Sequence, residues 1–301
     1  MEIVKKGKSN GWKSILKFLF PYLIGVGSLQ IIGALVLGLD LKNINNSSQT
    51  PVQLTVMTFI TMIATVGLVW LFTTKVDKKP FSVIGFGTAS FGKDMLWGIL
   101  MGLVIMLSGY YILIQIHEIQ FVKLNFQALN LLLNVAIFVM VALTEEILVR
   151  GYFLRNLMVS FNNYLALFIS ALIFSLMHLA NPNVTPVSLS IIFLSGLVLG
   201  LPYVYSKNIW FPVALHFSWN FFQGPIFGFN VSGTTIYKLI ETKYTTANYW
   251  NGGEFGFEGS VLAVFFLLSA VAVVYFVFRN RTPLTEDAEE PALAEVNENS
   301  I

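Results

Sequence analysis

Eight long apolar segments constrain the fold of this chain more than any other feature of its sequence. A helix needs about 20 apolar residues to cross the hydrocarbon core of a bilayer. With 11% charged residues and a mean hydropathy of +0.72, the chain also differs from soluble domains, in which about 25% of residues are charged. We therefore predict an all-α polytopic membrane bundle of about eight transmembrane helices. The segments lie near residues 15–39, 52–74, 94–116, 128–158, 163–180, 187–205, 209–228 and 260–278.

The distribution of Lys and Arg between the connections predicts how the bundle is oriented. Fourteen of the 18 lie at the N-terminus, in residues 75–93, near the turn at 150–163, at Lys207 and in the C-terminal tail. Positive residues concentrate on the cytoplasmic side of membrane proteins. The pattern thus predicts an integral, multi-pass protein of the cell membrane with both termini cytoplasmic. The remaining four, assigned to the outer side, are Lys42, Lys123, Lys238 and Lys243.

Two further expectations concern the ends of these spans. The apolar run that follows the N-terminal lysines is too long for a cleaved signal peptide, so we expect a retained signal anchor. The fourth segment is longer than a single span requires, and we expect its last turns, with Arg150 and Arg155, to emerge from the membrane.

Composition divides the chain into four parts. Residues 1–127 hold the first three spans with their basic segments, and 128–228 hold the next four. Residues 229–281 comprise an outer connection and the last span. The connection, 229–259, is rich in Gly, Asn, Tyr and Thr, and would be either a lid or an exposed connector. Residues 282–301 carry six acids and no base, which predicts a disordered tail.

Composition excludes cysteine-dependent sites and gives no reason to expect nucleic-acid binding, and glycine spacing predicts close helix contacts. The chain has no cysteine, which excludes disulfides, thiolate metal sites and a cysteine nucleophile. Its basic residues are scattered among loops, so no nucleic-acid partner is expected. The spacings Gly98 to Gly102 and Gly196 to Gly200 favour close contact between membrane helices.

Two adjacent carboxylates, Glu145 and Glu146, fall inside the fourth apolar segment. An ionisable side chain at the bilayer centre costs about 2.5–3.5 kcal/mol on insertion scales, so such residues usually mark a functional site. Glu146 precedes Arg150 by four residues, the favourable order for an ion pair within a helix. Pairing would leave Glu145, about 100° around the helix, free to act as a general base.

Counting residues places three further polar side chains near the same depth. Glu145 lies ten residues before Arg155, or about 15 Å into the membrane at 1.5 Å per residue. A helical hairpin that closes at residues 161–163 would bring His178 to the same height. His216 lies nine residues after Lys207, about 13 Å deep, and Asn220 shares its helix face. The sequence predicts a cavity within the membrane, entered from the cytoplasm.

Less specific interpretations stay open for each residue. Glu146 could be purely structural, each histidine could only hydrogen bond a neighbouring helix, and Asn220 could join two helices. Buried Glu and His also occur in transporters and proton relays. A transporter should show internal repeats or interrupted spans in two halves, and the sequence shows neither.

Three motifs on three predicted helices resemble those of the CPBP family, which comprises type II CAAX prenyl endopeptidases and the bacteriocin-processing or immunity proteins also called Abi. They are EExxxR from Glu145 to Arg150, FxxxH at Phe174 and His178, and HxxxN at His216 and Asn220. The resemblance covers residues 128–228. It implies an eight-span bundle with an intramembrane catalytic cavity, and endoproteolysis of a peptide or membrane-protein substrate.

The resemblance also implies a role for each motif residue. Glu145 and His178 would activate water, while His216 and Asn220 would stabilise the oxyanion. Phe174 would line the cavity, and Glu146 and Arg150 would brace the helix.

The resemblance leaves three alternatives open. The family is classed as metalloproteases, and Glu145, His178 and His216 would make a zinc site with an open position. The same groups would suffice for metal-free catalysis, which we favour, with no other cofactor expected. A non-catalytic immunity or scaffold protein remains an alternative to the enzyme. Neither the natural substrate nor the oligomeric state follows from the sequence.

Overall fold

The computed structural model describes residues 10–41 and 49–281. The expectations for Lys42, the extreme N-terminus and the acidic tail therefore lie outside the described residues. Within the described ranges, the α-helices are α1 (Gly11–Val36), α2 (Pro51–Leu71), α3 (Phe91–Gln115), α4 (Ala128–Glu146), α5 (Arg155–Ser160), α6 (Asn163–Met177), α7 (Pro186–Ser206), α8 (Trp210–Phe221) and α9 (Val261–Phe278).

The structure confirms an all-α membrane bundle, in which every predicted span contains a helix. Six helices of the described chain are long and apolar enough to cross a membrane. The other two predicted spans are shorter, because α6 has 15 residues and α8 has 12. At 1.5 Å per residue they measure about 22 and 18 Å, less than the roughly 30 Å of a hydrocarbon core. α8 continues as one π-helical turn, η5 (Phe222–Ile226).

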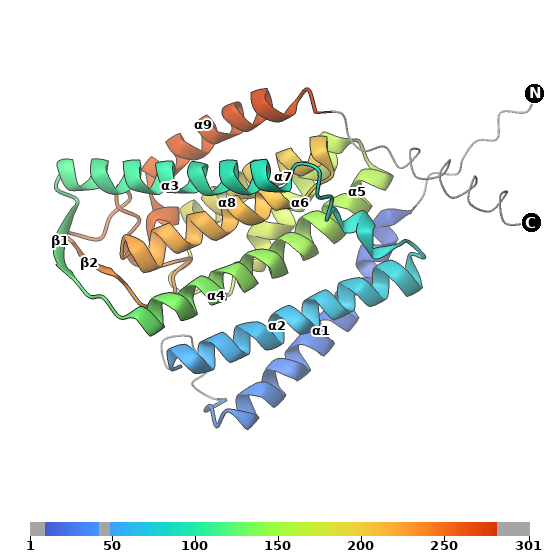
Figure 1. Cartoon of the computed structure of the whole chain (residues 1–301), viewed down its shortest axis with the longest axis horizontal. Helices are drawn as coiled ribbons and strands as arrows, with labels where there is room; N and C mark the ends of the chain where they lie inside the picture. Colours follow the sequence, from blue (N-terminus) through green and yellow to red (C-terminus); the bar gives the residue numbers. More distant parts are fainter. Residues whose placement is uncertain (1–9, 42–48, 282–301) are drawn as a thin grey trace, which may run out of the picture.

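The helices pack so that α4 and α8 lie at the centre. α1 pairs with α2, α2 packs on α4, and α8 contacts both α4 and α3. α6 packs on α7, which contacts α9 (Figure 1). This order brings helices from both halves of the chain around α8.

The two ends of the bundle differ in their connections. α2, α4, α7 and α9 all begin at one end, at the left of Figure 1, which we call the loop end. At the other end, which we call the basic end, lie Lys79, Arg155, Lys207 and Arg281. The alternation of helices thus agrees with the two groups of connections defined from the sequence. Which end faces the cytoplasm remains a prediction from charge.

The loop end carries a small sheet that the sequence did not predict. β1 (Ile119–Leu124) pairs antiparallel with β2 (Ile240–Tyr244), with Ile119 opposite Tyr244 and an irregularity between Phe121 and Lys123. This sheet joins residues 229–259 to the connection between α3 and α4 (Figure 1).

Residues 229–259 are packed against the bundle. Phe229 and Phe257 are fully buried, and Asn251 donates to Glu118 and to the carbonyl of Thr246. The alternative of an exposed connector is therefore wrong. These residues form a folded cover over the loop end.

Arg150 and Arg155, which the sequence predicts to emerge from the membrane, are both buried within the protein, while their depth in the bilayer stays a prediction. Their relative exposures are 0% and 8%, because α4 continues without a break through a π-helical segment, η4 (Ile147–Leu154), into α5. All eight residues of η4 are buried, since α2, α6 and α7 pack around this segment. Burial of Arg150 therefore requires partners inside the protein.

Glycines at the predicted spacings lie at close contacts between helices. A Cβ on Gly98 would lie 2.6 Å from the Cβ of Ala214, and one on Gly102 would collide with Ser218. A Cβ on Gly196 would lie 2.9 Å from the Cα of Ala171. Small residues let helix backbones approach each other where no hydrophobic force drives association. The first two contacts join α3 to α8, and the third joins α7 to α6.

We expect Gly102→Val to destabilise the protein by about 1–3 kcal/mol, the usual cost of overpacking a tight contact. The added side chain would push α3 away from Ser218, whose Oγ donates to the carbonyl of Gly98. Thermal unfolding in detergent measures the change. Gly92→Val, on the same helix, is the matched control, because a Cβ at Gly92 would meet no atom within 4 Å. Equal melting temperatures for the two variants would contradict the prediction.

Candidate active site

A cavity of about 290 Å³ lies between α4, α6, α7 and α8. Glu145, His178, His216 and Asn220 all line it. The four residues come from three helices and are up to 75 positions apart, yet they share one enclosed space. The cavity also contains aliphatic side chains, so water inside it is limited to a few polar positions.

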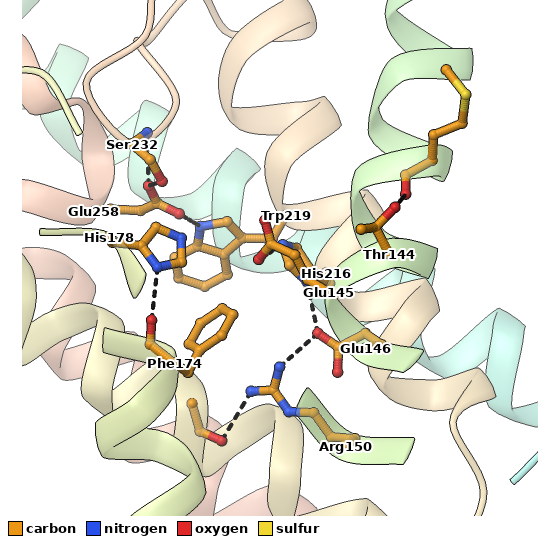
Figure 2. Close-up of polar contacts among 12 residues, drawn as sticks. Thr144, Glu145, Glu146, Arg150, Phe174, His178, His216, Trp219, Ser232 and Glu258 are labelled. Atoms are coloured by element: carbon orange, nitrogen blue, oxygen red, sulfur yellow. Dashed lines mark hydrogen bonds and ion pairs between the residues drawn. The ribbon is translucent and has the colours of Figure 1, made fainter. Parts of the chain in front are cut away.

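Glu146 connects the polar residues of the site. Its Oε1 accepts hydrogen bonds from Arg150 Nη1 at 2.8 Å and from His216 Nδ1 at 2.7 Å (Figure 2). Both side chains of the ion pair are essentially unexposed, at 1% for Arg150 and 0% for Glu146. The predicted ion pair is therefore present, and it also orients the imidazole of His216.

The guanidinium of Arg150 is held by three groups from different elements. Besides Glu146, it donates to the carbonyl of Gly196 at 3.2 Å and lies 4.5 Å from the centre of the Phe174 ring. A buried charge needs such compensation, because desolvation is costly. Arg150 thus ties α7 and α6 to the helix that carries both glutamates.

Glu145 differs from Glu146 in being partly exposed, although the Oε2 of each carboxylate is buried without a hydrogen-bond partner. The side chain of Glu145 is 25% exposed. Its Oε2 lies 3.9 Å from Nε2 of His216, too far for a direct hydrogen bond. Two polar atoms at this separation can share one water molecule, since each can lie within hydrogen-bonding distance of the same oxygen.

His178 follows the last residue of α6 and is half-buried. Its Nδ1 lies 2.8 Å from the carbonyl oxygen of Phe174 (Figure 2). A carbonyl only accepts, so Nδ1 carries the proton and Nε2 of the neutral ring is an acceptor. The Phe174 ring contacts both imidazoles, with centroids 4.9 Å from that of His178 and 6.1 Å from that of His216.

The structure adds a carboxylate to this cavity that sequence reasoning missed. Glu258 is 7% exposed, and its two oxygens accept from Trp219 Nε1 at 3.1 Å and from Ser232 N at 2.9 Å and Oγ at 2.7 Å (Figure 2). These bonds fasten the cover to α8, one residue before Asn220. The signal in the sequence was the density of phenylalanines around this glutamate, which is unusual for a solvated loop.

The cavity lies towards the loop end of the bundle. Leu54 and Thr58 come from the first two turns of α2, and Asn181 and Ser232 come from connections at that end. Among the described residues, none that lines the cavity comes from the connections at the basic end. The lining therefore gives no support to entry from the side of Arg155 and Lys207, and entry from the cytoplasm stays a prediction. The depths of Glu145 and His216 were counted from Arg155 and Lys207, and this count took no account of the cover at the loop end.

The residues proposed for zinc do not assemble into a metal site. In the part of the chain that the structure describes, no three His, Asp or Glu side chains lie close enough together to hold a metal ion. The Nδ1 of each imidazole is hydrogen bonded, His178 to Phe174 and His216 to Glu146, which leaves only Nε2 of each ring available to a ligand. These side chains do not fit a metal as placed, so the mechanism below uses side chains alone.

Comparison with known proteins identifies the segment that holds the site. Residues 127–222 match a family model described as type II CAAX prenyl endopeptidase Rce1-like. Neither the curated proteins nor the solved structures include a match to the chain. All three motifs and every candidate residue on α4, α6 and α8 fall within the matched segment. Residues 127–222, about a third of the chain, are thus similar to the type II CAAX prenyl endopeptidases that this family model describes.

Proposed function

We propose that the protein is an intramembrane endopeptidase that hydrolyses a peptide bond in the cavity between α4, α6 and α8. The observation that carries the proposal is the unpaired Oε2 of Glu145, which faces His216 Nε2 at 3.9 Å. Glu146 is fixed through its Oε1 by Arg150 and His216, whereas Glu145 lines the cavity and no hydrogen bond fixes its Oε2. A carboxylate oxygen without a hydrogen bond, at the edge of a cavity, is suited to accept a proton from water.

In the first step, Glu145 removes a proton from a water molecule, and the oxygen of this water attacks the scissile carbonyl carbon. The neutral tautomer of His178 supports this step, because its Nε2 can accept a hydrogen bond from the same water. The attack forms a C–O bond, and the π electrons of the carbonyl move onto its oxygen. The tetrahedral intermediate then expels the amine, which takes the proton from Glu145.

The oxyanion is stabilised by the Nε2–H of His216 and the side-chain amide of Asn220. For His216 to donate from Nε2 while Nδ1 bonds to Glu146, its ring must carry both protons. Charge supports this form, because Glu145, Glu146 and Glu258 contribute three negative charges against one positive charge from Arg150, and an imidazolium reduces the excess. Glu146 and Arg150 act as positioning residues that keep this ring in place.

The proposal is tested by incubating detergent-purified protein with a farnesylated CAAX peptide and with unprenylated peptides, and by analysing the products by mass spectrometry. We expect a defined internal cleavage that is insensitive to a chelator. His216→Ala should slow it by about 10²–10³-fold, the usual cost of losing an oxyanion donor. Cleavage of the farnesylated peptide alone would assign a CAAX substrate.

Two results would count against the proposal. Failure to cleave any peptide by a folded protein would favour the non-catalytic immunity or scaffold alternative. Inhibition by the chelator, restored by added zinc, would contradict the metal-free mechanism while keeping the endopeptidase.

A further inference from the structure

A second cavity, of about 190 Å³, adjoins the first on the side of the loop end. The two share Leu54, Ile137 and Ile236, which separate them. The second cavity is also lined by Gln49 and Tyr237, both of which lie outside the helices at the loop end. The two cavities thus adjoin each other between that end of the bundle and Glu145.

This second cavity contains two hydrogen-bond acceptors without partners. Asn134 is 2% exposed, and its side-chain Nδ2 donates a hydrogen bond to the carbonyl of Asn130. The Oδ1 of the same side chain has no hydrogen-bond partner. The Oε1 of Gln49 is likewise buried without a partner. Unsatisfied polar atoms cost several kcal/mol in a membrane, so two in one cavity indicate a ligand with donors. The N–H groups of an extended polypeptide supply such donors at regular spacing.

The charge distribution indicates which side of the membrane the second cavity faces. Among the described residues, the loop end carries Lys123, Lys238 and Lys243, whereas ten Lys and Arg residues lie at the basic end. By the positive-inside rule the loop end lies outside the cytoplasm. The second cavity thus lies towards the outer side.

We propose that the substrate is a polypeptide segment exposed on the non-cytoplasmic side of the membrane, which enters through the second cavity and donates its main-chain N–H groups to Asn134 and Gln49. The inference rests on the proposed endopeptidase function. It selects exported or outward-facing segments as the substrate class over C-termini that are prenylated in the cytoplasm.

The absence of cysteine from the chain allows the access route to be measured without any substrate. Single cysteines would be introduced into the full-length protein by Thr234→Cys at the cover, Ser195→Cys in the catalytic cavity and Lys79→Cys at the basic end. Intact cells would then be treated with a negatively charged, membrane-impermeant methanethiosulfonate. Ser195 and Thr234 both line the first cavity, and Lys79 is exposed.

We expect Thr234→Cys and Ser195→Cys to be labelled in intact cells, and Lys79→Cys only after permeabilisation. Labelling of Lys79→Cys in intact cells would mean that the orientation is reversed. Failure to label Ser195→Cys from outside would mean that no path leads from this side to the catalytic cavity. Either result overturns the inference, and neither depends on whether any peptide is cleaved.

The route itself is tested by adding Ile236→Trp to the Ser195→Cys protein, which should abolish its labelling from outside because Ile236 separates the two cavities. Phe126→Trp is the matched control, since Phe126 is 69% exposed at the same end. Labelling of Lys243→Cys in the same Ile236→Trp background verifies that the protein is folded and inserted. Unchanged labelling of Ser195→Cys would exclude the second cavity as the route.

Discussion

Replacing Glu145 with glutamine is expected to lower kcat by about 10²–10⁴-fold, the range usually lost with a general base. Glutamine keeps the shape of the side chain but cannot accept the proton of the attacking water. The fold should not change, because the Oε2 of Glu145 makes no hydrogen bond and the side chain is one-quarter exposed. Single-turnover cleavage of the best peptide, with thermal unfolding measured in parallel, separates the two effects.

The matched control for this variant is Glu254→Gln, at an exposed carboxylate in the cover. It should cleave at the wild-type rate. Wild-type cleavage by Glu145→Gln as well would remove the general base from the mechanism. A large fall in melting temperature would instead show that Glu145 stabilises the fold, which its missing partner argues against.

Arg150→Leu is expected to destabilise the protein by about 3–5 kcal/mol, the cost of leaving a buried charge without its partner. The substitution removes the hydrogen bonds to Glu146 and to the carbonyl of Gly196, and the cation–π contact with Phe174. Glu146 would retain only His216 as a donor. Unfolding by titration with a denaturing detergent measures the loss of stability.

A double variant distinguishes loss of the ion pair from loss of packing. In Glu146→Leu/Arg150→Leu no carboxylate is left uncompensated, so we expect it to be more stable than Arg150→Leu alone. Arg279→Leu, at an exposed residue beside Phe276 on α9, serves as the surface control and should change stability by less than about 0.5 kcal/mol. If Arg150→Leu were as stable as Arg279→Leu, Arg150 would contribute little to the stability of the protein.

The apolar segments and the local motifs were predictable because each depends on residues close together in the sequence. The Glu146–Arg150 pair follows from a spacing of four, and the contact of Phe174 with His178 also follows from a spacing of four. Residue counting brought Glu145 and His178 into one cavity for a similar reason, since one hairpin joins their helices.

Other features depended on contacts that no local pattern encodes. Glu146 and His216 are 70 positions apart, and their bond depends on how α4 and α8 pack. The position of Glu258 depends on the cover, whose pairing of β1 with β2 joins residues more than 100 positions apart. The burial of Arg150 could not follow from the length of the fourth apolar segment, because it depends on the packing of α2, α6 and α7 around η4.

The position of the ion pair within one helix has a consequence for biosynthesis. Glu146 and Arg150 can neutralise each other as soon as this helix leaves the ribosome and enters the bilayer, whereas His216 is not synthesised until 70 residues later. Early pairing lowers the free energy needed to insert this acidic helix into the bilayer. A nascent chain should therefore insert stably while still unable to hydrolyse its neighbours, and become competent only when α8 arrives.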